Sequence, residues 1–244
     1  MRAMILAAGI GSRLKPLTDK CPKALIEIGG VPMLELVTER LKLAGVDAIV
    51  INTFHLADQI EAFLKVRRNL GILIEISRES ELLDTGGGLK QVSSFFNDGL
   101  PFFLHNVDVL GDVDLARMYR YHQENKALVT VAVRKRESKR FLLFNAQGRL
   151  CGWESITGKQ EWAGRQVSYF ERLAFDGIHV ISPEIFQKIT ETGAFSILEV
   201  YHRLAVEGEK IVAFRTDGSY WRDIGSIDKL KAARNEAGQG RTVG

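Results

Sequence analysis

The chain has 244 residues, 45% of them hydrophobic, and its 33 lysines and arginines nearly balance 30 aspartates and glutamates. This composition predicts a folded globular protein with a sizeable core. The near-even charge excludes a diffuse electrostatic attraction to nucleic acid or to a membrane surface. Any anion-binding site must therefore be local.

The two cysteines, Cys21 and Cys151, lie far apart and form no CxxC pair. This pattern predicts free thiols in a reducing cytoplasm, and neither a disulfide framework nor a zinc site. The apolar opening MRAMILAAGIG is short and breaks at glycine, so we interpret it as a buried strand and not a signal peptide. No stretch approaches the roughly 20 apolar residues of a membrane helix. We expect a cytoplasmic protein without membrane contact.

Short β-branched runs alternate with amphipathic stretches through the first half of the chain. The pattern predicts strands at residues 2–7, 48–53 and 72–77, and helices at 33–44 and 55–66. Such an alternation is typical of βαβ units and a mostly parallel sheet. A glycine run at 86–88 then opens a further helix.

The segment PFFLHNVDVL, residues 101–110, predicts a strand that is apolar on both faces until it reaches Asn106 and Asp108. In open α/β sheets, ligands bind at the carboxyl ends of the strands. These two polar residues are therefore candidates for a binding site.

In the second half, the pattern changes after a helix from about residue 114 and a strand at 127–134. Hairpin-like strand pairs are expected at 140–153 and 167–181, helices near 183–189, 197–208 and 226–237, and a strand at 211–217. The predicted fold is α/β: a Rossmann-like, mostly parallel mixed sheet flanked by helices, with a smaller α+β portion in the second half. We expect a single domain over residues 1–237, with halves at about 1–135 and 136–237, and a frayed tail at 238–244.

The loop after the first strand begins with Gly9 and Gly11, which permit positive φ angles and let backbone amides approach an anion closely. The loop departs from the dinucleotide-binding fingerprint GxGxxG, because the third glycine position is Leu14 and Pro16 follows, and this strongly disfavours a dehydrogenase. The P-loop pattern GxxxxGK[ST] is missing as well.

Four cations follow in the same loop: Arg13, Lys15, Lys20 and Lys23. Arginine can hold two phosphate oxygens at once and lysine supplies a mobile point charge, so the loop suits a polyphosphate. The alternative is an ordinary solvated surface loop. Taken alone, Lys15 and Lys20 fit that alternative better.

The stretch AGIGSRLKPLTDKCPKAL resembles the signature loop AGxGxRLxPLTxxxPKxL of the sugar nucleotidyltransferases, or NDP-sugar pyrophosphorylases. TGGG at 85–88, NVD at 106–108 and WRDIG at 221–225 follow in that family's order, so the resemblance covers nearly the full chain. Among short members, LLDTGGGLK is most similar to the muramate, mannose and heptose 1-phosphate nucleotidyltransferases, which use UTP or GTP.

The resemblance implies a reaction in which a sugar 1-phosphate attacks the α-phosphorus of a nucleoside triphosphate and releases pyrophosphate. Such transfers depend on positioning and charge neutralisation. By analogy, Arg13 holds the departing phosphates and Lys23 contacts the reacting ones. Asp108 and Asp223 resemble the family's two Mg²⁺ ligands. Read singly, each carboxylate could equally be a turn or cap residue.

The resemblance also implies binding residues. For the nucleotide these are Ala7, Ala8, Gly9, Gly11, Ser12, Arg13, Gly86 and Gly87. For the sugar phosphate they are Lys23, Glu154, Asp176 and Gly177. The glycine run could instead be a helix entry capped by Asp84 or Thr85.

Several neighbouring polar residues have simpler interpretations. Asp176 could be a simple turn residue, and we expect turn or cap roles for Asn52 and His55. We interpret Asp112 and Asp114 as caps of the next helix.

The sequence departs from the family pattern at two places. Val107 replaces the glycine of the usual N-G-D, which requires a β conformation there. The Glu-Lys-Pro sugar motif has no clear counterpart, and Glu154 is the nearest candidate. Two alternatives to the enzyme therefore stay open: a catalytically silent nucleotide-sugar sensor, and a cytidylyltransferase acting on phosphocholine or another non-sugar phosphate. The oligomeric state is open.

Overall fold

A computed structural model describes residues 1–164 and 166–238, and the chain in it divides into two compact units. Unit 1 comprises residues 1–83, 104–115 and the chain after residue 218, and unit 2 comprises residues 84–103 and 116–218. These boundaries describe compactness, and the expected halves at about 1–135 and 136–237 stay a prediction. Of the expected frayed tail, only Gly238 lies within the described residues.

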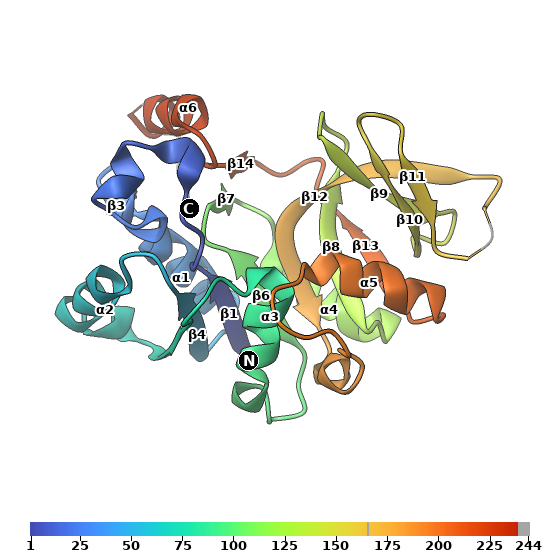
Figure 1. The fold of residues 1–244 in the computed structure, drawn as a ribbon, viewed down its shortest axis with the longest axis horizontal. Coiled ribbons are helices and arrows are strands. Elements are labelled where there is room, and N and C mark those ends of the chain that lie inside the picture. Colours follow the sequence, from blue (N-terminus) through green and yellow to red (C-terminus); the bar gives the residue numbers. More distant parts are fainter. Residues whose placement is uncertain (165, 239–244) are drawn as a thin grey trace. The chain divides into compact units, whose positions relative to one another are not determined.

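Unit 1 is built on a parallel sheet in which each strand follows the expected alternation with helices (Figure 1). Its strands, in spatial order, are β6 (Phe102–Asn106, whose first two residues belong to unit 2), β1 (Arg2–Leu6), β4 (Ala48–Thr53) and β5 (Leu73–Arg78). All six residues of β4 are buried, as befits a strand in the interior of a parallel sheet. The helices α1 (Met33–Leu43) and α2 (Ala57–Val66) flank the sheet.

Smaller elements complete unit 1. They are the 3₁₀ turns Ser12–Leu14, Leu17–Asp19, Lys23–Leu25 and Arg68–Gly71, the strands β2 (Glu27–Ile28), β3 (Val31–Pro32), β7 (Val109–Gly111) and β14 (Trp221–Asp223), and the helix α6 (Ile227–Gly238). Strands β7 and β14 form an antiparallel pair although more than a hundred residues separate them. This pair joins the NVD and WRDIG motifs.

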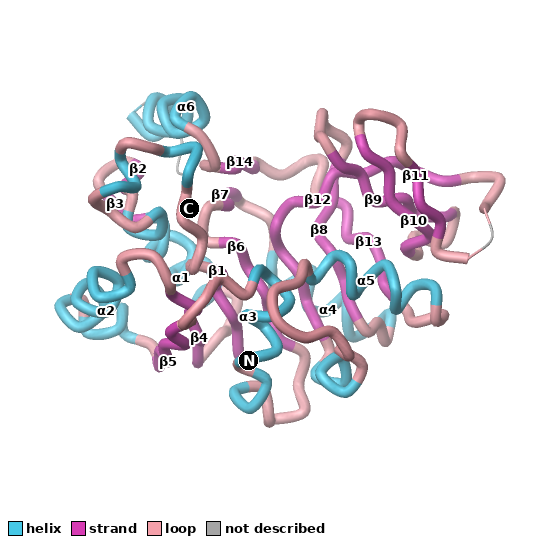
Figure 2. Tube along the Cα trace, viewed as in Figure 1, coloured by secondary structure: helices cyan, strands magenta, loops and turns pink. Residues whose placement is uncertain are grey.

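The strand pairs of unit 2 are mainly antiparallel, and Figure 2 marks its strands in magenta. Its strands are β8 (Val129–Arg134), β9 (Arg140–Asn145), β10 (Leu150–Ser155), β11 (Gln160–Trp162), β12 (Phe170–Ile181) and β13 (Ile211–Arg215). Its helices are α3 (Asp84–Gln91), α4 (Leu115–Asn125, whose first residue belongs to unit 1) and α5 (Ile197–Val206), with 3₁₀ turns at Ser93–Phe95 and Pro183–Gln187. The expected α/β class, with an antiparallel portion in the second half, is confirmed.

Two expectations about unit 2 are wrong in detail. The segment 167–181 contains no second hairpin: β12 is one strand, and its pairing with β8 jumps from Phe175–Val133 to His179–Val131. Gly177 lies inside this bulge with a φ of 82°, so the turn-like DG step bends a strand without ending it. The helix expected near 183–189 is only a 3₁₀ turn.

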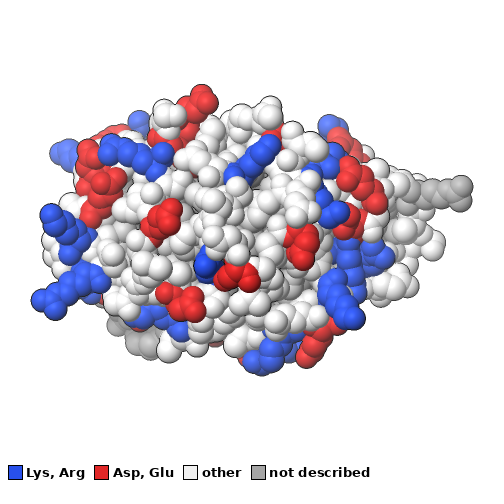
Figure 3. All heavy atoms as spheres, turned by 90° about the horizontal axis from the view of Figure 1, so that it is seen from below, with Lys and Arg blue, Asp and Glu red and all other residues white. Residues whose placement is uncertain are grey.

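Stacked aromatic rings form part of the core of unit 2. In unit 2 the rings of Phe96 and Phe102 stack with their centroids 3.8 Å apart, and Phe186 stacks on Phe102 at 5.6 Å. One face of the protein shows acidic and basic side chains intermixed, without a large area of one sign (Figure 3). Within the described chain, no helix has both the length and the apolar character needed to cross a membrane.

Candidate active site

The glycine-rich loop of unit 1 leaves β1 and folds into three short turns. Gly11 adopts the left-handed conformation with a φ of 69°, and a Cβ there would lie 2.8 Å from Cγ2 of Thr18. The hydroxyl of Thr18 donates to the carbonyl oxygen of Gly11 at 3.0 Å, and the buried Leu14 anchors the first turn. The loop is therefore shaped by its own packing, with Arg13 on its exposed side.

The loop cations have different surroundings. Lys15 pairs with Asp19 at 3.2 Å, and both side chains are at least half exposed. Lys23 forms an ion pair with Asp108, and only 14% of the lysine side chain and 18% of the aspartate side chain are exposed. The structure thus brings two predicted site residues into direct contact, whereas Lys15 is a surface lysine.

Strands β7 and β14 hold the two candidate metal ligands close in the backbone. Asp223 pairs with Val109, the residue after Asp108, and the amide of Ile224 donates to the carbonyl oxygen of Asp108 at 2.8 Å. Asp223 is 26% exposed, and its Oδ2 accepts a hydrogen bond from Nζ of Lys229 at 2.5 Å.

The space around Gly225 is crowded, which explains why the WRDIG motif ends in glycine. A Cβ on Gly225 would lie 2.6 Å from Oδ1 of Asp223 and 2.8 Å from Nη2 of Arg13. These polar atoms therefore occupy the space that a side chain would fill. Arg13, which precedes Asp223 by more than two hundred residues, is brought beside it at this point.

Two further carboxylates support the β7–β14 pair. Asp112, for which we expected a capping role, accepts a hydrogen bond from the amide of Tyr220 at 2.7 Å and so joins the two strands. Glu236 on α6 accepts from the hydroxyl of Tyr220 at 2.6 Å and also binds the guanidinium of Arg222. Helix α6 thereby fixes the residues on both sides of Trp221.

A buried polar chain fixes the start of the loop, and sequence reasoning missed its central residue. Asn52 accepts from the amide of Ala7 at 2.8 Å and donates to Glu79 at 2.7 Å, and Glu79 accepts from the amide of Leu83 at 3.1 Å. Asn52 and Glu79 are 3% and 4% exposed. The sequence signal that could have identified Glu79 is that this glutamate directly follows the third strand, β5. His55, expected in a turn, contacts the carbonyl oxygen of Thr18 through Nε2 at 2.7 Å.

In unit 2, packing accounts for the first glycine of the run. Gly86 donates from its amide to the carbonyl oxygen of Phe195 at 2.9 Å, and a Cβ there would lie 2.3 Å from the Phe195 ring. The carboxylate of Asp84 accepts from the amide of Thr85, and the hydroxyl of Thr85 accepts from the amide of Ile197 at 2.9 Å. Contact of Gly86 and Gly87 with a nucleotide stays a prediction.

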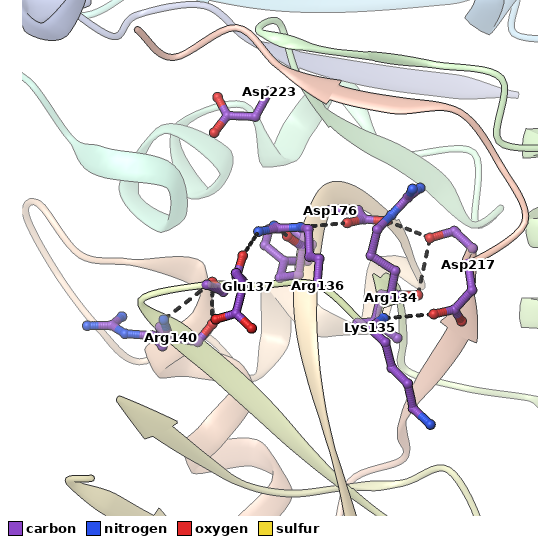
Figure 4. Close-up of polar contacts among 12 residues, drawn as sticks. Arg134, Lys135, Arg136, Glu137, Arg140, Asp176, Asp217 and Asp223 are labelled. Carbon is purple, nitrogen blue, oxygen red and sulfur yellow. Dashed lines mark hydrogen bonds and ion pairs between the residues drawn. The ribbon is translucent and has the colours of Figure 1, made fainter. Parts of the chain in front are cut away.

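Asp176 lies at the centre of a buried cluster in unit 2 (Figure 4). Its side chain is wholly buried, and its Oδ2 accepts from Nε of Arg134 at 2.7 Å and from the hydroxyl of Thr216 at 2.5 Å. Arg136 approaches Oδ1 with its Nε at 3.6 Å. Burial raises the pKa of Asp176, although Thr216 and the two arginines oppose that rise. Because its side chain is wholly buried, Asp176 presents no exposed oxygen to a sugar in this structure.

Glu154, the other acidic sugar candidate, belongs to a different contact set. It pairs with Arg172 at 2.8 Å and accepts from Gln160 at 3.0 Å, and 14% of its side chain is exposed. Arg172 lies over the ring of Phe141, with its guanidinium carbon 4.7 Å from the centroid. The roles of Glu154, Asp176 and Gly177 toward a sugar stay predictions.

Comparison with known proteins places this chain among related sequences and folds. The N-acetylmuramate alpha-1-phosphate uridylyltransferase of Caulobacter vibrioides is 31% identical over 95% of this chain and 94% of its own length. The mannose-1-phosphate guanyltransferase of Yarrowia lipolytica is also 31% identical, over 92% of this chain, but the match spans only 61% of that longer protein.

A solved structure of UDP-glucose pyrophosphorylase complexed with UDP-glucose has the same fold, with a TM-score of 0.79 at 20% identity over 98% of this chain and 99% of the other. Residues 2–240 match the family described as nucleotidyl transferase. The chain belongs to the nucleotidyl transferase family.

Proposed function

We propose that this protein is a sugar 1-phosphate nucleotidyltransferase. A phosphate oxygen of the sugar 1-phosphate forms a bond to the α-phosphorus of a nucleoside triphosphate, and the bond from that phosphorus to the bridging oxygen breaks, releasing pyrophosphate. The observation that carries the proposal is the convergence in unit 1 of Lys23 with Asp108 and of Arg13 with Asp223. The names of the similar uridylyl- and guanylyltransferases support it.

The cations of unit 1 perform the electrostatic part of the reaction. Arg13 presents its guanidinium on the exposed side of the loop, where two N–H groups can hold the leaving pyrophosphate. Lys23 supplies a second positive charge from a largely buried position, so little reorganisation is needed when negative charge develops on the phosphates. Both residues stabilise the transition state by position and charge, without a covalent intermediate.

Asp108 and Asp223 fit a divalent cation such as Mg²⁺. They offer hard carboxylate oxygens from adjoining backbone segments, and both side chains are partly exposed. These two carboxylates would hold the ion, since Mg²⁺ in proteins commonly takes one or two carboxylates together with substrate phosphates and water. A bound Mg²⁺ supplies charge neutralisation at the phosphates.

We assign the nucleotide to Ala7, Ala8, Gly9, Gly11, Ser12, Gly86 and Gly87, with UTP or GTP as the donor. The Asn52–Glu79 chain supports the first of these residues because it holds the amide of Ala7. At the sugar end, Lys23, Glu154 and Gly177 are the proposed contacts. Asp176, being wholly buried, acts there through the bulge that it anchors.

We also propose that the enzyme is cytoplasmic, in keeping with its two free cysteines. Burial raises the pKa of Cys151 to about 11, which makes this thiol unreactive. The proposal names no macromolecular partner and leaves the oligomeric state open.

The test is pyrophosphate release in the presence of Mg²⁺, with each common nucleoside triphosphate paired with a panel of sugar 1-phosphates and with phosphocholine. We expect release with one sugar 1-phosphate and either UTP or GTP. Release only with CTP and phosphocholine would replace the sugar by another phosphate acceptor. Saturable binding of a nucleotide sugar without any release would favour the sensor.

A further inference from the structure

Lys229 is a charged residue beside the proposed metal site that neither the motifs nor the family resemblance singles out. It is the third residue of α6, and its Nζ lies 2.5 Å from Oδ2 of Asp223. The lysine side chain is 47% exposed and the aspartate side chain 26%. The contact is therefore open to solvent and can exchange.

The position of Lys229 runs against the local preference of a helix. The N-terminal turn of a helix carries a partial positive charge, which favours acidic residues such as Asp228 and disfavours a lysine. The ammonium of Lys229 reaches back beyond the start of α6 to Asp223. A residue that breaks a local rule at a candidate site is a marker of function.

The chain's own cations already neutralise both candidate metal ligands. Asp108 is paired with Lys23, while Asp223 has Lys229 at one oxygen and Arg13 near the other. A divalent cation that approaches Oδ2 of Asp223 meets an ammonium at that atom. Because like charges at such a separation repel, Lys229 would have to move away for the ion to bind fully.

We propose that Lys229 is a positioning residue that holds Asp223 in the metal-free protein and weakens its affinity for divalent cations. The inference rests on the proposed function, because it takes Asp223 to be a metal ligand. Exposed ion pairs of this kind typically change an equilibrium by a few-fold. We therefore expect a modest but measurable tuning of metal affinity.

The experiment is titration of the nucleotide-free protein with Mn²⁺, followed by electron paramagnetic resonance of the free ion. Lys229→Met should bind Mn²⁺ about fivefold more tightly than the wild type. Asp223→Asn should bind it more weakly, and adding Lys229→Met to Asp223→Asn should bring no gain. This double-mutant cycle isolates the coupling between the two side chains.

Lys231→Met is the matched control, because it removes the same charge from an exposed position on the same helix. An equal gain in Mn²⁺ affinity in both lysine variants would overturn the inference, since net charge alone would then explain it. If Asp223→Asn weakens binding but Lys229→Met leaves it unchanged, the inference fails and the metal assignment stands. If Asp223→Asn leaves binding unchanged, the metal assignment itself fails.

Discussion

Unit 1 and unit 2 each contain aspartates surrounded by cations, but the two arrangements differ in exposure and in partners. In unit 1, Asp108 and Asp223 are partly exposed and each is paired with a lysine. In unit 2, Asp176 is wholly buried and is held by Arg134 and Thr216. Lysine is a mobile point charge, whereas arginine binds in a fixed geometry. We therefore expect the first set to exchange partners with ligands and the second to maintain the fold.

The largest expected effect on activity concerns the partly exposed aspartates of unit 1. Asp108→Asn should lower the rate of pyrophosphate release by about a hundredfold or more, because it removes one of the two proposed ligands of the ion that would neutralise the reacting phosphates. Because Asp108 and Lys23 are both largely buried, the variant should also lower the free energy of unfolding, which urea denaturation measures separately from activity. Asp58→Asn, at an exposed site on α2, is the control. Full activity in Asp108→Asn would remove this residue from the site.

For the wholly buried Asp176 we expect a large effect on stability. Asp176→Ala should lower the free energy of unfolding by roughly 3–5 kcal/mol, because it leaves the buried charge of Arg134 without this carboxylate. Urea denaturation measures the loss. Asp217→Asn is the control, because Asp217 is 38% exposed and should cost about 1 kcal/mol or less. A loss of similar size in both variants would contradict the distinction between the buried and the exposed set.

Acid should destabilise both units through buried histidines. Burial lowers the pKa of His105 in β6 and of His122 in α4 to about 4. In the unfolded chain each ring binds a proton below about pH 6.5, so stability is complete above that pH and falls as the pH drops toward 4. Each histidine contributes on the order of 3 kcal/mol to this loss.

Urea denaturation at pH 7.5, 6, 5 and 4 measures this loss. His122→Gln should show a shallower decline than the wild type, because one titrating ring is removed. An unchanged slope in this variant would indicate that other groups cause the acid sensitivity.

The smallest expected effect on stability separates two kinds of glycine within unit 1. Gly9 has open space around it, with no described heavy atom within 4 Å of an added Cβ, whereas Gly225 is crowded by Asp223 and Arg13. Gly9→Ala should leave the thermal midpoint within about 2 °C of the wild type, and any loss of activity would then reflect close approach of the nucleotide. Gly225→Ala should lower activity by displacing Arg13 or Asp223. Wild-type activity in Gly225→Ala would contradict the effect expected from crowding at this position.

Many of the strands and helices could be predicted from the sequence, because hydrophobic periodicity is a property of a short stretch of chain. The strand 48–53 and the helix that starts at Met33 lie where hydrophobic periodicity predicts them. The hairpin predicted at 167–181 is wrong because the local sequence does not distinguish two kinds of Asp-Gly step. One kind bends a bulged strand, and the other forms a turn that ends the strand. The local sequence contains no information on whether the partner strand β8 continues alongside.

For the candidate site, the sequence by itself determined which residue types are present: the glycine-rich loop, its cations and the aspartates of the NVD and WRDIG motifs. Only the tertiary structure decided their partners. The pairing of β7 with β14 brings Asp223 to the residue after Asp108, and the fold sets Lys229 against Asp223 and Glu79 against Asn52. A short motif fixes its own residues, but distant partners meet only when the sheet and the last helix assemble, because burial and pairing are properties of the whole chain.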